Sequence, residues 1–352
     1  MSINKKSKLM LFPRIGKFII IFVAIAFIIA GIRGYQLYQY VFRENVKNDY
    51  VLYILPGATF EQVTDSIKKN DALISLKAFH WVSKKKEYPK SVKEGRYLLK
   101  KGMNTNQIVN MLIGGIQTPL NVTFNNVRTK EDLAGKVSKY LIADSLSILN
   151  LFQDENQIKE FGFDAETYRT MFIPNTYQFY WTTSAEGFAN RMKFEFDRFW
   201  SDERRKKAEN IDLSPVEVTI LASIVQSETA KNEEMPRIAG LYINRLKQGQ
   251  LLQADPTVKY AVGDFSLKRI LNIHLEVDSP YNTYKYAGLP PGPINFPETS
   301  AIDAVLNFER NNYIYMCAKE DFSGYHSFAV TLAEHNRNAA KYRRELDKLK
   351  IK

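Results

Sequence analysis

Apolar positions follow three patterns along the chain. Residues 18–32 form an uninterrupted apolar run. Residues 51–140 repeat three times a short strand-like run, a glycine or asparagine turn and a segment with helical spacing. From residue 145 onward, apolar residues recur mainly at helical spacing. These patterns predict an α+β chain with an N-terminal transmembrane helix, small strand–helix modules and then a larger mixed α/β domain.

The apolar run 18–32 has the flanks of a membrane anchor. With Lys17 snorkelling, or with the tyrosines of 35–42 as an interfacial belt, the segment crosses a hydrocarbon core of about 30 Å. A cleaved signal peptide is the alternative, but its Ala24-Ile25-Ala26 site lies in the middle of the apolar run. Because basic flanks stay in the cytoplasm, we expect a cytoplasmic basic tail at 1–17 and a single-pass signal-anchor at 18–40, in the cell (inner) membrane. The rest of the chain is then periplasmic or otherwise extracytoplasmic.

The three repeats predict strands at 51–55, 95–99 and 119–124, each followed by an amphipathic helix with a threonine or asparagine at its start. Modules of this kind resemble LysM-type glycan-binding domains. A plain α+β spacer that holds the next domain away from the membrane explains the same pattern. We expect this module at 45–140 and a second domain at 141–352.

The segment 214–230 predicts a helix that carries an acid on its apolar face. Ser214 and Glu217 form a capping box, with proline at the first helical position. Glu228 follows one helical turn after Ile224 on the apolar stripe. Burial disfavours a charged carboxylate and raises its pKa, as a general acid near neutral pH requires. The structural alternative is that Glu228 ends a core helix and pairs with a cation such as Arg237.

Composition narrows the function classes. The chain has 352 residues, 45% of them hydrophobic, which indicates packed cores, and a net charge of +11. Residues 1–50 hold eight Lys and Arg against two acids, so the excess over the rest is mild and does not favour a nucleic-acid groove. Cys317 is the only cysteine, which excludes an intrachain disulfide or a thiolate metal cluster. The four histidines match no zinc motif and no glycine-rich phosphate loop follows a strand, so no cofactor or metal is expected.

Several polar motifs follow the helix 214–230. A polar turn at 253–257 precedes a long proline-rich loop at 279–294, whose prolines lower the entropy lost when a binding wall is ordered. A loop of this length without structure of its own is usually functional. Further on, 324–328 reads GYHSF, and a terminal helix is expected from residue 331 to 349.

Six motifs occur together in register: ASIVQSETA, LQADPTVKYAVG, SPYNTY, GLPPGPI, GYHSF and EHN. In this order and spacing they resemble the MltG/YceG-like endolytic murein transglycosylases. The anchor, the LysM-like segment and the turn at 172–177 fit as well, so the resemblance covers nearly the whole chain. It implies a membrane-anchored lyase that cuts nascent peptidoglycan strands internally and ends their elongation.

The resemblance also implies residue roles. The family's catalytic glutamate maps onto Glu228. Many relatives carry a second acid two residues earlier, where this chain has Gln226, and an aspartate where this chain has Asn175. We expect five further residues to bind or orient the glycan: Gln253, Asp255, Asn282, Tyr284 and His326.

Two other functions stay open at this point. A hydrolytic muramidase would use Glu228 with Asp255, since hydrolysis ordinarily needs two carboxylates. A non-catalytic glycan-binding scaffold would rest on the repeat segment alone. The expected partners are peptidoglycan strands. Peptidoglycan synthases are plausible partners as well, because an enzyme that ends strand elongation has to act where the synthases release new strands. No motif indicates oligomeric state, stem-peptide preference or Gram type.

Overall fold

The structure is a computed structural model that describes residues 12–267 and 269–348, with side chains from residue 17 onward. The chain folds into two compact units. The first contains the described residues up to Pro119 together with Tyr180–Thr182, and the second contains Leu120–Phe179 and the chain from Thr183 onward. Most of the predicted basic tail, including Lys5, Lys6 and Lys8, lies outside the described residues.

The first helix, α1 (Phe12–Phe42), is the predicted apolar segment. Its stretch Lys17–Phe42 is long and apolar enough to cross a membrane. The most apolar part of this stretch is not buried against the rest of the protein. It is the only such helix among the described residues. Near its end, the ring of Tyr40 lies 6.3 Å from that of Trp81 in the first unit.

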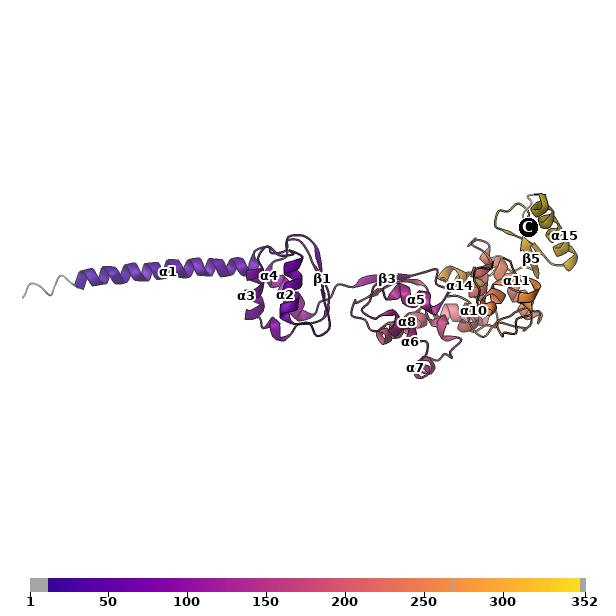
Figure 1. The fold of residues 1–352 in the computed structure, drawn as a ribbon, viewed down its shortest axis with the longest axis horizontal. Helices are drawn as coiled ribbons and strands as arrows, with labels where there is room; N and C mark the ends of the chain where they lie inside the picture. Colours follow the sequence, from indigo (N-terminus) through magenta and orange to yellow (C-terminus); the bar gives the residue numbers. More distant parts are fainter. Residues whose placement is uncertain (1–11, 268, 349–352) are drawn as a thin grey trace, which may run out of the picture. The chain divides into compact units, whose positions relative to one another are not determined.

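The first unit is built on a two-stranded antiparallel sheet, whose first strand, β1 (Tyr50–Ile54), is labelled in Figure 1. The register of the sheet places Leu52 opposite Tyr97. Both side chains are fully buried. Thr59 and Asn104 each form a capping box at the start of a helix, as the repeat pattern predicts. The elements are β1 (Tyr50–Ile54), α2 (Phe60–Lys69), α3 (Leu76–Lys85), a 3₁₀ turn (Tyr88–Lys90), β2 (Gly95–Leu99) and α4 (Thr105–Gly114).

The third repeat has the predicted local structure but packs elsewhere. It forms β3 (Leu120–Phe124) and α5 (Lys130–Val137), with Thr129 as the helix cap. β3 pairs with β4 (Asn175–Phe179), and its inward side chains join the core of the second unit. The boundary between the units therefore falls after Pro119, whereas the sequence prediction placed it between 140 and 141. The segment 172–177, predicted as a turn, enters β4 at Asn175.

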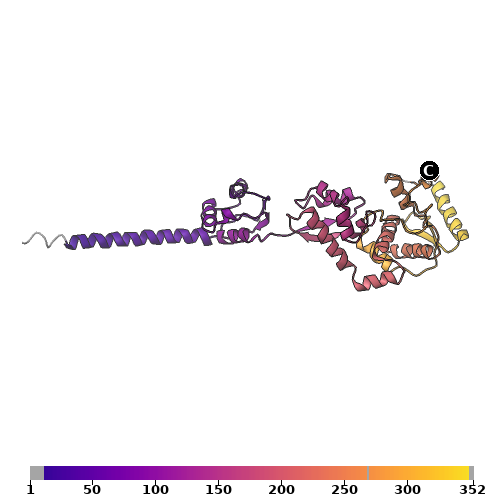
Figure 2. The same cartoon turned by 90° about the horizontal axis from the view of Figure 1, so that it is seen from below.

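The remainder of the second unit is mostly helical. The aromatic-rich segment after residue 184 forms two helices, Ala185–Phe199 and Asp202–Glu209, which are separated by Trp200 and Ser201. Two further strands pair antiparallel, and the terminal helix packs on them (Figure 2). The elements are α6 (Ser145–Asn150), α7 (Glu155–Glu160), a 3₁₀ turn (Tyr168–Met171), α8 (Ala185–Phe199), α9 (Asp202–Glu209), α10 (Pro215–Glu228), α11 (Met235–Lys247), α12 (Asp255–Val262), α13 (Asn272–Leu275), α14 (Thr299–Leu306), β5 (Tyr315–Ala318), β6 (His326–Ala329) and α15 (Leu332–Lys348).

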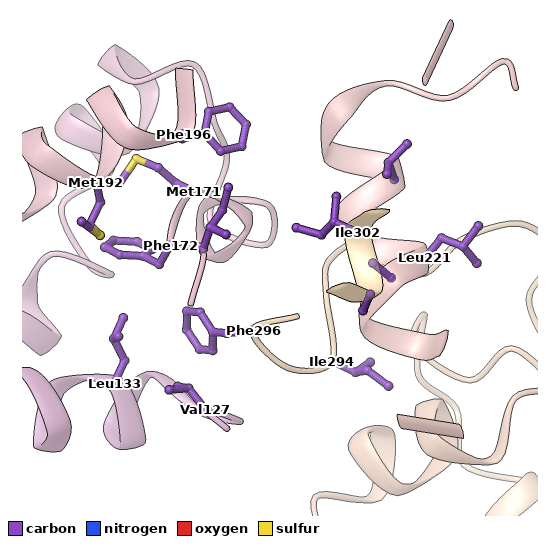
Figure 3. Packing of buried hydrophobic residues seen from close by; sticks show 14 of the residues in the cluster. Val127, Leu133, Met171, Phe172, Met192, Phe196, Leu221, Ile294, Phe296 and Ile302 are labelled. Atoms are coloured by element: carbon purple, nitrogen blue, oxygen red, sulfur yellow. The ribbon is translucent and has the colours of Figure 1, made fainter. Parts of the chain in front are cut away.

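Helix α10 is the central element of the second unit. The predicted capping box is present: the Ser214 hydroxyl accepts from the Glu217 amide, and the Glu217 carboxylate accepts from the Ser214 amide. All eight residues from Val218 to Val225 are buried, so the helix is covered on every side rather than on one stripe. α11 and α14 pack against it. Figure 3 shows Leu221 and Ile302, from α10 and α14, in this core. This packing fixes the end of the helix, where Glu228 lies.

Candidate active site

Glu228 is the last residue of α10 and lines a pocket of about 220 Å³. The pocket draws side chains from α10, α11, the start of α12, the proline-rich loop and the β5–β6 pair. Four of the five predicted glycan-contacting residues line it, although they are separated by up to 73 positions in the sequence. The lining residues are Glu228, Leu241, Tyr242, Arg245, Leu252, Gln253, Asp255, Tyr284, Met316, Cys317, Ala318 and His326.

The Glu228 carboxyl has the protonation behaviour of a general acid. Its side chain is half-buried, with a small part open to the pocket and the rest densely surrounded by protein. Removal of water from its surroundings raises the pKa of Glu228 from 4.5 to about 7. The Tyr242 hydroxyl donates to Glu228 Oε1 at 2.7 Å, which favours the charged form and opposes this rise. The carboxyl is therefore able to hold or release a proton near neutral pH.

Charged neighbours also shift the pKa of the Glu228 carboxyl. Asp255 raises the pKa of Glu228 because two negative charges disfavour each other, whereas His326 and Arg245 lower it. Arg245 is buried, and its guanidinium donates to the Ile314 and Leu252 carbonyls at 2.7 Å and 2.6 Å. No carboxylate of the described residues pairs with this guanidinium, so its charge remains in the pocket. The pocket carries two acids opposed by one permanent cation and one histidine.

His326 is held by a buried carboxylate. Glu234 is 5% exposed and accepts two hydrogen bonds from this residue, one from the His326 amide at 2.7 Å and one with Nδ1 at 2.9 Å. With the Nδ1 proton directed at Glu234, Nε2 is the acceptor nitrogen of the neutral ring. Nε2 forms no hydrogen bond with any described residue. The ring is therefore oriented with one nitrogen available for a ligand.

Asp255 and Tyr284 form a second hydrogen-bonded pair in the pocket. The Tyr284 hydroxyl donates to Asp255 Oδ1 at 2.6 Å, and burial together with this bond raises the pKa of the tyrosine. Asp255 is the first residue of α12, with Pro256 inside the first turn, where a missing amide proton costs nothing. The sequence prediction of a polar turn over 253–257 is thus wrong from Asp255 onward, because the helix begins at this residue.

Gln253 lies before this helix in a strained conformation. Its φ is 48°, in the left-handed region that costs a non-glycine residue about 1–2 kcal/mol. The Gln253 amide donates to the Thr283 carbonyl at 3.0 Å, which ties it to the proline-rich loop. The side chain is exposed and lines the pocket.

Asn282 is the predicted site residue that the structure does not bring to the pocket. Its side chain is fully buried and donates to the Leu275 and Val277 carbonyls at 2.9 Å and 2.8 Å. Its Oδ1 accepts from the Tyr284 amide at 3.1 Å. Every polar atom of the side chain is thus engaged within the loop. Asn282 supports the backbone of Tyr284 and has no atom free to contact a glycan.

The two departures from the family pattern are also placed by the structure. Gln226 Oε1 accepts from the Glu298 amide at 2.7 Å, so it caps the start of α14. Gln226 does not line the Glu228 pocket. Asn175 begins β4, is exposed and accepts a hydrogen bond from the Thr176 amide. Neither position competes with Glu228 as an acid.

Sequence reasoning missed three contributors to the pocket. Tyr242 and Arg245 lie on α11 and Glu234 directly precedes that helix, and no recognisable sequence motif marks any of the three. Their i, i+3 spacing puts the tyrosine and the arginine on one face, which is the only signal available. The cation proposed as a structural partner of Glu228, Arg237, instead pairs with Glu309 at 2.9 Å. Among the described residues, no group of three or more His, Cys, Asp or Glu side chains is arranged to hold a metal ion.

Comparison with known proteins agrees with the motifs. The profile of the YceG-like family matches residues 52–341. The chain belongs to the YceG-like family. The family match includes the first unit from Leu52, within β1, onward and all the residues that line the Glu228 pocket.

Relatives of this YceG-like chain include named enzymes and a solved structure. A Bacillus subtilis (strain 168) protein named endolytic murein transglycosylase is 30% identical over 302 residues, covering 81% of this chain and 82% of that protein. A Streptococcus pneumoniae (serotype 2, strain D39) protein of the same name is 28% identical, covering 91% of this chain but 64% of that protein. A crystal structure of a YceG-like protein from Listeria monocytogenes matches with a TM-score of 0.55 and 27% identity, covering 82% of this chain and 98% of that chain.

Proposed function

We propose that this chain is an endolytic murein transglycosylase that cleaves the bond between N-acetylmuramic acid and N-acetylglucosamine inside nascent glycan strands. The observation that carries the proposal is Glu228, a single acid with its pKa raised to about 7 in a pocket lined by hydrogen-bonding side chains. The family membership and the names of the relatives point to the same reaction. Cleavage of this kind ends strand elongation.

Glu228 acts first as acid and then as base. Its proton passes to the glycosidic oxygen as the bond from that oxygen to muramic acid C1 breaks. The C6 hydroxyl of the same sugar then attacks C1, and its proton passes to the Glu228 carboxylate. The products are a 1,6-anhydro-muramic end and a free N-acetylglucosamine hydroxyl, with no water consumed. The intramolecular nucleophile supplies effective molarity that solvent does not, so one carboxyl is sufficient.

The other pocket residues bind and orient the glycan. Tyr242 holds the Glu228 carboxyl in place through its 2.7 Å bond. His326 offers Nε2 to a sugar hydroxyl or acetamido N–H, and Gln253 offers an exposed amide from the rim. Asp255, paired with Tyr284, places negative charge near the anomeric carbon, where positive charge develops.

Asp255 also supports a second candidate function. It lines the same pocket as Glu228, so a hydrolytic muramidase with Asp255 as the second carboxylate has the required side chains. The bond from Tyr284 occupies one of its oxygens, which suits an electrostatic role better than attack on carbon. The two reactions differ in the fate of water, because hydrolysis adds one water oxygen to muramic acid C1.

The test is digestion of uncross-linked glycan strands by the full-length protein in detergent, in heavy-oxygen water, with products read by mass spectrometry. We expect anhydro-muramic ends that are lighter by one water and carry no heavy oxygen. Glu228→Gln should lower the rate by roughly 10²–10⁴-fold, and Glu160→Gln, at an exposed acid that lines neither cavity, is the matched control. Reducing ends that carry heavy oxygen would establish the muramidase instead. Unchanged cleavage by Glu228→Gln would remove Glu228 from the chemistry. No cleavage by the wild-type protein would leave a non-catalytic binding scaffold.

The length and apolar composition of α1 support a membrane anchor. We propose a single-pass anchor with a cytoplasmic N-terminus, an extracytoplasmic second unit, and peptidoglycan synthases as neighbours where strands emerge. The strand–helix–helix–strand order of β1, α2, α3 and β2 supports a LysM-like, glycan-binding first unit. In a Cys317→Ser background, a cysteine placed at exposed position 323 should react with a membrane-impermeant maleimide on intact cells or spheroplasts. Labelling only after lysis would contradict this topology.

A further inference from the structure

A second and larger cavity lies beside the Glu228 pocket, wholly within the second unit. Its volume is about 650 Å³. Ser227 and Pro256, the chain neighbours of Glu228 and Asp255, line it, so the two cavities share the end of α10 and the start of α12. We call it the basic pocket, and its lining residues are Asn126, Val127, Arg128, Thr129, Asp132, Gln226, Ser227, Pro256, Lys259, Phe265, Ile294 and Asn295.

Two cations of the basic pocket have no carboxylate partner. Neither Arg128 nor Lys259 forms an ion pair with any described residue. The guanidinium of Arg128 lies over the Phe265 ring, with its central carbon 4.7 Å from the ring centroid, which leaves the edge of its planar fork for a ligand. The one acid of the lining, Asp132, already accepts from the Arg128 and Thr129 amides at 3.2 Å and 3.1 Å. The pocket therefore has excess positive charge.

A buried acceptor without a partner gives a second, independent indication of a ligand. Asn295 is 8% exposed, and its Nδ2 donates to the Ser223 carbonyl at 2.9 Å and to the Ser227 hydroxyl at 2.8 Å. These bonds fix the amide on the last turns of α10. Its Oδ1 has no hydrogen-bond partner among the described residues. An unpartnered buried acceptor costs about 1–3 kcal/mol, so an N–H or O–H donor from a ligand would relieve it.

We propose that the basic pocket binds the stem peptide carried by the muramic acid next to the cleaved bond. This inference rests on the proposed function. Arg128 and Lys259 bind peptide carboxylates, for which the arginine fork is suited. A peptide N–H supplies the donor that Asn295 Oδ1 lacks. Strands stripped of peptide keep only a lactyl carboxylate on the sugar and are bound less tightly. The pocket thus makes the enzyme selective for peptide-bearing, newly made strands.

Binding is measured separately from cleavage, so that the peptide-binding proposal and the proposed reaction are tested by different measurements. Full-length Glu228→Gln protein in detergent is titrated calorimetrically with a tetrasaccharide that bears two pentapeptides, and with the same tetrasaccharide stripped by an amidase. We expect the double substitution Arg128→Gln, Lys259→Gln to weaken binding of the peptide-bearing ligand at least tenfold, and of the stripped ligand less than threefold. Melting temperatures check that the variants fold.

The matched control is Arg310→Gln with Lys247→Gln, which removes the same charge from exposed positions outside the pocket. It should leave both affinities unchanged. An equal loss for both ligands would show that the cations attract any glycan strand, and no loss for either would show that the cavity holds no peptide. Both results overturn the inference. Failure of the proposed reaction would instead appear as missing anhydro ends in the wild-type digest, whatever these affinities are.

Discussion

The charge of Glu228 should reduce the stability of the folded protein at neutral and alkaline pH. The pKa of Glu228 is raised from 4.5 to about 7, so the folded state holds a proton that the unfolded chain has lost between these values. Below pH 4.5 both states are protonated and the residue contributes no pH dependence. As pH rises through 7 the buried site must become charged, at a cost of about 3 kcal/mol for this shift. Because the side chain is only half-buried, solvent screens part of this cost, and we expect the charge to lower the free energy of unfolding by about 1–3 kcal/mol.

Glu228→Gln removes this cost and keeps an oxygen that accepts from Tyr242. The variant should therefore be more stable than the parent at pH 8 by about 1–3 kcal/mol, and by nothing at pH 4. Urea unfolding is followed in a background with Trp81→Phe and Trp181→Phe, because Trp200 is then the only tryptophan and reports on the second unit.

The control for this measurement is Glu160→Gln, at an exposed acid on α7 outside the pocket. Its stability should follow that of the parent at every pH. A constant difference between Glu228→Gln and the parent from pH 4.5 to 8.5 would refute the reasoning, since an effect without pH dependence does not come from the charge.

Three further predictions concern activity. Tyr242→Phe removes a bond that favours the charged form, so the pKa of Glu228 rises further and the alkaline limb of the kcat/KM profile should move to higher pH by up to about one unit; an unmoved limb would contradict this role. Glu234→Gln releases the histidine it holds and should lower kcat/KM by roughly tenfold, whereas Glu233→Gln, at the exposed neighbour, should not. Gln226→Glu should not restore activity to Glu228→Gln, because its oxygen is directed at the start of α14; recovered anhydro ends would show otherwise.

Local structure was predictable where a single residue type decides it. The caps at Thr59, Asn104, Thr129 and Ser214 each form the expected box, because a short polar side chain satisfies amides that the first helical turn leaves free. The apolar segment likewise forms one helix, since its length and composition suffice. These predictions depend on a few neighbouring positions and need no tertiary information.

The partners of each element were not predictable in the same way. The three repeats look alike in sequence, yet β1 pairs with β2 while β3 pairs with β4, about 50 residues further along. Nothing local to 120–137 specifies that partner, so the domain boundary was placed too late. The four-residue strands β5 and β6 were missed for a similar reason. Short strands with intermediate burial on every residue but one lack the alternation that identifies a strand.

For the candidate site too, the sequence does not tell which side chains meet in space. Polar residues in the loop could be nominated from their type, but type does not tell which of them face a cavity. Tyr284 and Asn282 are two positions apart, yet only Tyr284 lines the pocket. The side-chain amide of Asn282 instead donates hydrogen bonds to backbone carbonyls nearby. No polar motif marks Tyr242, whose ring is buried while its hydroxyl reaches Glu228. Burial of the ring and function of the hydroxyl are compatible, since tyrosine has an apolar body and a polar tip.

The end of α10 explains how one helix can serve both cavities. Successive residues of a helix point about 100° apart, so three neighbours at its end face three directions. Gln226 caps α14, Ser227 lines the basic pocket and supports Asn295, and Glu228 enters the small pocket. Because Val218 to Val225 are buried on every side, this last turn cannot shift without disturbing the core. A peptide bound beside Ser227 would therefore position its own sugar at Glu228 through a rigid turn, which gives a physical reason for the acid to lie on the last residue of the most deeply packed helix.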